Sequence, residues 1–154
     1  MAADATAGFA RRPDGWTPAR IFMVVSVLYH LPLAIAGLAI DQTFPFGGSE
    51  AARAGSEHVF GIFETNGWHS LAALLVGLAS VYFAVRPERA REAALVIGVG
   101  HVGVFLALTF WAPETFWLAS NAADQVVHAS TAVLGTGAAL LTGPGRSRAS
   151  TSAA

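Results

Sequence analysis

Side chains that bind metals, move protons and accept hydrogen bonds gather in one short stretch, Asn121-Ala-Ala-Asp124-Gln125-Val-Val-His128. The four polar residues are spaced by three, one and three positions, which places them on one face of an α-helix. Asp124 and His128 are four residues apart, a spacing at which a carboxylate accepts a hydrogen bond from an imidazole. The stretch opens an apolar segment, where polar groups are costly unless they find partners.

A shorter copy of this pattern, Asn66-Gly-Trp-His69, opens an earlier apolar segment. The two copies meet if the helices pack with their polar faces inward. The sequence therefore predicts one polar cluster in the outer half of a helix bundle, made of six residues: Asn66, His69, Asn121, Asp124, Gln125 and His128.

Each of four apolar segments contains one histidine: His30, His69, His101 and His128. At about 1.5 Å per residue from the flanking arginines, His30 and His101 fall near the middle of a bilayer, and the other two fall nearer its outer surface. We therefore expect two separate levels of histidines. Imidazoles from facing helices suit haem iron, copper or zinc, so all four are candidate metal ligands. Buried Asp and His are also typical of proton relays, and of hydrogen-bonded networks that only stabilise packing.

Long apolar segments must position these residues. Of the 154 residues, 54% are apolar and 12% charged, whereas soluble domains contain about 25% charged residues. About 20 apolar residues in a helix cross the roughly 30 Å hydrocarbon core of a membrane. We therefore expect an all-α, integral membrane four-helix bundle, with spans at about 21–40, 68–85, 93–111 and 119–141. Residues 1–20 and 142–154 are expected to be disordered cytoplasmic arms, and residues 56–63 a short interfacial helix.

The arginines predict the orientation of the bundle. Eight of the nine lie in segments that face the same side of the four predicted spans, and the positive-inside rule makes that side cytoplasmic. Both termini would then be cytoplasmic, in a bacterial-type plasma membrane. The absence of Cys excludes disulfides and thiolate sites, and the net charge of −1 argues against a nucleic-acid partner. The expected partners are the lipid bilayer and a membrane protein or a second copy of the chain.

Two motifs at the entrances of the second and fourth spans resemble a known family. They are Phe63-Glu64-Thr65-Asn66-Gly67-Trp68-His69 and the stretch from Asn121 to His128. They are similar to a bacterial membrane family called domain of unknown function 4383, over about residues 21–141. Members usually carry a second histidine one helical turn after the first, where this sequence has Ala73. The resemblance implies the four-span architecture and implies no activity.

The matching motifs also suggest two helix hairpins arranged as a parallel repeat. As function, the sequence points to a small, non-enzymatic structural or accessory membrane protein with the polar cluster in the outer half of its bundle. Two alternatives stay open. One is a redox protein that binds haem or a transition metal through histidines of facing helices, and the other is a proton-coupled carrier. No catalytic residue is predicted, and the cofactor is left unassigned.

Overall fold

The computed structural model describes residues 15–46, 56–111 and 117–143. This part of the chain is mostly helical, as predicted. Its four α-helices are α1 (Pro18–Ile40), α3 (Gly67–Ala84), α4 (Ala90–Leu106) and α5 (Ala122–Thr142), and α4 continues into a π-helical turn, η2 (Ala107–Trp111). Two short strands, β1 (Glu57–Val59) and β2 (Phe63–Thr65), precede α3.

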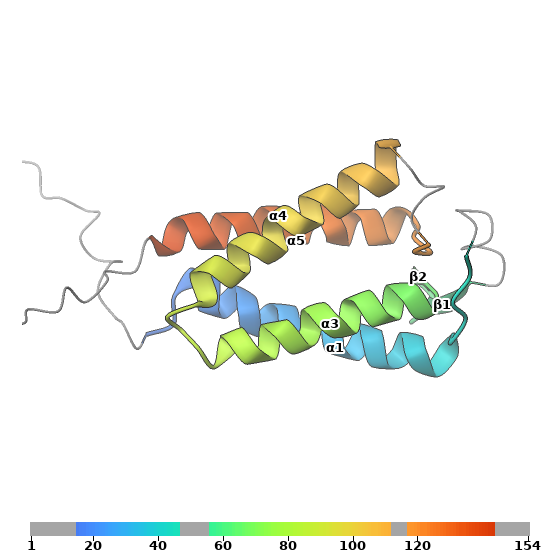
Figure 1. The fold of residues 1–154 in the computed structure, drawn as a ribbon, viewed down its shortest axis with the longest axis horizontal. Coiled ribbons are helices and arrows are strands. Elements are labelled where there is room, and N and C mark those ends of the chain that lie inside the picture. Colours follow the sequence, from blue (N-terminus) through green and yellow to red (C-terminus); the bar gives the residue numbers. More distant parts are fainter. Residues whose placement is uncertain (1–14, 47–55, 112–116, 144–154) are drawn as a thin grey trace, which may run out of the picture.

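The helices form two antiparallel pairs, α1 with α3 and α4 with α5 (Figure 1). The pairs meet where α1 lies against α4 and α5, whereas α3 and α4 have few contacts. Both ends of the described chain and the α3–α4 turn lie at one end of the bundle, which we call the terminal end. The strands and residues 117–121 lie at the opposite end, the hairpin end. The pairing agrees with two helix hairpins; their relation as a repeat stays a prediction.

Capping side chains mark the starts of α1, α3 and α5. Thr17 Oγ1 accepts a hydrogen bond from Arg20 N at 3.2 Å, and Pro18 occupies the first turn, where its missing N–H costs nothing. The predicted arm therefore ends before residue 18, because residues 18–20 are already helical. At the other end of the sequence, α5 begins at Ala122 and not at the predicted residue 119, because Asn121 is its N-cap. Residues 1–14 and 144–154 lie outside the described part.

The first connection contains a β-hairpin where a short helix over residues 56–63 was expected. Glu57 pairs with Thr65 and Val59 with Phe63 in antiparallel register. Residues 60–62 connect the strands, and Phe60 and Gly61 within this connection have positive φ angles of 55° and 71°, which turn the chain back on itself. The expectation of a helix was wrong, because the chain reverses at Phe60 and Gly61 and the two short strands pair with each other.

Small residues bring the helices of each pair together. A Cβ atom on Gly98 would lie 2.5 Å from Thr136 N on α5, and one on Gly77 would lie 2.5 Å from Leu31 Cδ2 on α1. Between α1 and α3, Ser26 Oγ and Ser80 Oγ are hydrogen-bonded at 2.8 Å. Such close contacts through small and hydroxylated residues are typical of helices that pack in membranes.

The bundle carries its apolar side chains outside and many polar ones inside. Leu28, Val96 and Leu140 are each more than two-thirds exposed, whereas Ser80 is fully buried and Asp124 is 2% exposed. Three helical segments of the described chain are long and apolar enough to cross a membrane: Pro18–Ile40, Gly67–Ala84 and Ala90–Phe110. The helix α5 is long enough but less apolar, because polar residues occupy its first turns.

Candidate functional site

The two sequence motifs meet at the hairpin end through hydrogen bonds between side chains and main chain. Asn66 Nδ2 donates to Trp117 O at 2.7 Å, and Asn121 Nδ2 donates to Ile62 O at 2.8 Å. Each asparagine is also the N-cap of the helix that follows it, because Asn66 Oδ1 accepts from His69 N and Asn121 Oδ1 accepts from Ala123 N. The asparagines therefore tie each motif to the backbone that precedes the other motif, and they start α3 and α5.

Asp124 completes this joint. Its Oδ2 accepts hydrogen bonds from Asn121 N at 2.9 Å and from Glu64 N at 3.2 Å. The first bond forms a reciprocal capping box with Asn121, and the second attaches α5 to β2. The buried carboxylate therefore satisfies two main-chain donors that would otherwise lose hydrogen bonds. The spacing Asn-x-x-Asp contains this signal, whereas nothing in the sequence identifies the Glu64 donor.

Two members of the predicted cluster point elsewhere. Gln125 binds Ser120 Oγ through its amide nitrogen and accepts from Thr109 Oγ1, so it faces η2. His128 does not bind Asp124: both of its ring nitrogens are buried without a hydrogen-bond partner in the described part of the chain. The expected pairing of Asp124 with His128 was wrong, because Asp124 Oδ2 is engaged with main-chain donors and His128 turns toward the other histidines.

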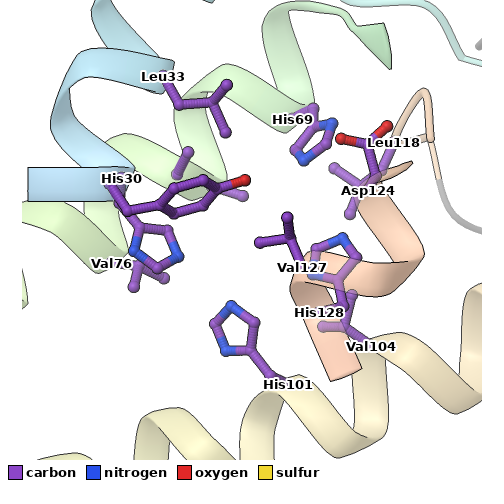
Figure 2. A pocket seen from close by; sticks show the side chains of 13 residues that line it. His30, Leu33, His69, Val76, His101, Val104, Leu118, Asp124, Val127 and His128 are labelled. Atoms are coloured by element: carbon purple, nitrogen blue, oxygen red, sulfur yellow. The ribbon is translucent and has the colours of Figure 1, made fainter. Parts of the chain in front are cut away.

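The four histidines of the spans, His30, His101, His128 and His69, follow one another around a cavity as a series of neighbouring rings, which we call the histidine column (Figure 2). Neighbouring ring centroids are 5.5 Å apart between His30 and His101, 5.6 Å between His101 and His128, and 5.9 Å between His128 and His69. Each of the four helices contributes one of these histidines. The expected division into two levels is not observed, because His128 lies between its neighbours on α3 and α4 and joins the levels.

The main chain fixes which nitrogen carries the proton in three of these rings. Nδ1 donates to Ser26 O at 2.9 Å in His30, to Ala119 O at 2.7 Å in His69, and to Ile97 O at 2.8 Å in His101. A carbonyl oxygen only accepts hydrogen bonds, so the hydrogen is on Nδ1, and Nε2 of the neutral ring carries a lone pair. None of these Nε2 atoms has a hydrogen-bond partner among the described residues.

The column lines a small cavity of about 90 Å³. Its wall consists of the four histidines, Asp124, Tyr29 and apolar side chains of all four helices. Ala73 belongs to this wall and is 5% exposed. A histidine at position 73, which is usual in the family that the motifs resemble, would therefore face the same cavity. A cavity of this size holds a few water molecules or an ion.

The residues do not form a ready metal or haem site. No group of three His, Asp or Glu side chains within residues 15–46, 56–111 and 117–143 has the geometry to hold a metal ion. The cavity is also far smaller than the roughly 300–1,000 Å³ of pockets that bind larger ligands, and a haem would need the helices to separate. The chemistry that the site offers directly is acceptance of hydrogen bonds, from up to three imidazole lone pairs beside one buried carboxylate.

Comparison with known proteins identifies a family and no individual relative. The model of the family described as Domain of unknown function (DUF4383) matches residues 20–141, nearly the range over which the motifs resemble that family. No curated protein and no solved structure matches the chain.

Proposed function

We propose the following role for the chain, which belongs to the DUF4383 family: it is a four-span protein of the plasma membrane that binds a small cation in its histidine-lined cavity and does not act as an enzyme. Both termini and the α3–α4 turn face the cytoplasm. The observation that carries this proposal is that one cavity is lined by three histidines, His30, His69 and His101, whose Nδ1 atoms are bound to the main chain and whose Nε2 atoms therefore carry lone pairs.

The distribution of buried and exposed side chains on α5 supports its assignment as the fourth span. Its polar residues include the buried Asp124 and Thr131, whereas Val126, Val133, Leu134 and Leu140 are between 59% and 71% exposed. Its 21 residues give a length of about 30 Å, and it packs along α4. Its lipid-facing side is therefore apolar, and its buried carboxylate, Asp124, finds hydrogen-bond partners inside the bundle.

The terminal side of the cavity is apolar. On the terminal side of His30 and His101, an apolar cluster fills the bundle with Ala19, Phe22, Met23, Ala90, Ala93, Ala94 and Ala139. The site therefore has the form of a binding cavity in the outer half of the membrane, and a carrier would need this cluster to open. The acceptor atoms and the Asp124 carboxylate favour a positively charged ligand that donates hydrogen bonds.

Ammonium and potassium ions test this proposal, since they have the same charge and similar size but only ammonium donates hydrogen bonds. We expect ammonium to shift the ¹⁵N resonances of the histidine rings in protein held in lipid nanodiscs, and equal concentrations of potassium to leave them unchanged. His101→Phe removes a central acceptor and should weaken the response, whereas His58→Phe alters an exposed residue of β1 outside the cavity. An equal response to both ions, or to neither, would contradict the proposal and leave the column as a packing feature.

A further inference from the structure

A second cavity lies at the terminal end, between the end of α3 and the beginning of α4. Its volume is about 500 Å³, within the range of pockets that bind small organic molecules. Phe83 from α3 and Val96 and Ile97 from α4 form its apolar wall, and Glu88, Arg89 and Glu92 stand at its rim. We call it the α3–α4 groove. The α3–α4 groove and the histidine-lined cavity have no lining residue in common.

The charges at the rim have no partners among residues 15–46, 56–111 and 117–143. Glu88, Arg89 and Glu92 are exposed, and no hydrogen bond or ion pair joins their side chains to any residue that the structure describes. The neighbouring Arg86 differs, because its guanidinium lies 3.7 Å from the ring centroid of Tyr82. One guanidinium and two carboxylates at the mouth of an apolar groove fit a ligand with an anionic group, a cationic group and a hydrocarbon chain.

We propose that the α3–α4 groove binds one phospholipid with a zwitterionic, primary-amine headgroup, of the phosphatidylethanolamine type. Arg89 contacts the phosphate, since a guanidinium donates paired hydrogen bonds to phosphate oxygens. Glu88 and Glu92 accept hydrogen bonds from the ammonium group. An acyl chain lies along Phe83, Val96 and Ile97.

The rim charges discriminate among the headgroups of a bilayer. An anionic headgroup without an amine would meet two carboxylates and only one guanidinium, which makes it a poor match. The quaternary ammonium of phosphatidylcholine has no N–H and cannot donate hydrogen bonds to Glu88 and Glu92. Phosphatidylethanolamine satisfies all three charges with one molecule.

This inference rests on the proposed insertion in a membrane, and it is independent of the ligand in the histidine-lined cavity. Resistance of the protein to extraction from membranes by alkaline carbonate tests insertion alone. A protein that stays in the membrane but shows no lipid preference would contradict the groove proposal and leave insertion intact. A protein that is extracted would contradict both.

Native mass spectrometry of the full chain, released from micelles supplied with lipids of identical acyl chains, measures the preference. We expect retention of phosphatidylethanolamine to exceed retention of phosphatidylcholine and phosphatidylglycerol. The variants Arg89→Gln and Glu92→Gln should each lower that retention by about fivefold, the scale of one partly screened charge contact. Arg86→Gln and Glu57→Gln change the same residue types outside the groove and should retain the lipid.

A variant of the apolar wall supplies a test that does not depend on charge. Ala79 lines the groove from α3, and Ala79→Phe should fill it and displace the lipid while thermal unfolding shows that the fold is kept. Equal retention of the three lipids, a preference for phosphatidylglycerol, or unchanged retention in both Arg89→Gln and Glu92→Gln would each overturn the proposal.

Discussion

At the residue scale, three histidines owe their chemical state to the backbone around them. His30 and His101 donate to the carbonyl four residues earlier in their own helices, and His69 donates to Ala119 O across the bundle. In a membrane such a bond satisfies the ring N–H without a second polar side chain. The remaining nitrogen of each ring is left as an acceptor, and this is why the column offers lone pairs to the cavity.

Ala73 provides the first residue-scale prediction. Ala73→His would add a fifth imidazole to a cavity that already contains four, and imidazole is a preferred ligand of zinc and cobalt. We expect the variant to bind Co²⁺ with the visible absorption of tetrahedral coordination, and the unchanged protein to bind it at least about tenfold more weakly. Leu75→His serves as the control, because Leu75 lies on the same helix but is 61% exposed and does not line the cavity. Equal binding by both variants would show that the fifth imidazole does not join a shared site.

Asp124 provides the second prediction at the residue scale. The amide oxygen of Asp124→Asn can still accept from both main-chain donors but carries no charge, so both bonds weaken, and the change adds a buried N–H₂ group. We expect a loss of about 1–3 kcal/mol in the free energy of unfolding, the usual cost of disturbing a buried, charge-assisted hydrogen bond. Unfolding in mixed micelles with increasing dodecyl sulfate measures it. Gln125→Ala, which alters a partly exposed side chain, should cost less; the reverse order would contradict the structural role of Asp124.

At the scale of the elements, the sequence predicts the helices better than the joints between them. Four apolar segments of sufficient length indicate four helices, and their approximate positions agree with α1, α3, α4 and α5. The exact start of α5 and the β-hairpin were missed, because they depend on hydrogen bonds between distant segments, such as Asn121 Nδ2 with Ile62 O. The same reason explains the cluster: residue spacing indicates a shared helix face, but only tertiary contacts direct Gln125 to Thr109 and away from Asp124.

The contact between α4 and α5 gives the prediction for this scale. Gly98→Ala would place a methyl group 2.5 Å from the Thr136 backbone nitrogen, and the two helices must move apart to accept it. We expect a loss of about 1–3 kcal/mol of stability. Gly103→Ala is a matched control on the same helix, because a Cβ there has nothing within 4 Å, and it should leave stability unchanged or raise it slightly. Similar losses in both variants would place the effect in the helix itself and not in the α4–α5 contact.

At the scale of the whole molecule, the two ends of the bundle differ in chemistry. The described arginines, Arg20, Arg86, Arg89 and Arg91, belong to helix ends and a turn at the terminal end. The hairpin end carries aromatic rings in mutual contact: Phe46 packs on Trp68 and Trp117, and Trp68 lies 5.6 Å from Trp117 between centroids. Aromatic residues favour both membrane interfaces, whereas arginines favour the cytoplasmic one. This difference supports the proposed orientation, with the histidine-lined cavity nearer the outer surface.

The absence of cysteine from the sequence makes this orientation directly testable, because a single introduced thiol has no background. Glu88→Cys places a thiol in the α3–α4 turn, and Glu57→Cys places one on β1; both positions are exposed. Because the positive-inside rule puts the arginine-rich end in the cytoplasm, a membrane-impermeant maleimide added to intact cells should label Glu57→Cys and spare Glu88→Cys. Permeabilised cells should show labelling of both variants, which confirms that each thiol is reactive. Labelling of Glu88→Cys alone in intact cells would show that the bundle has the opposite orientation, with the histidine-lined cavity nearer the cytoplasmic side.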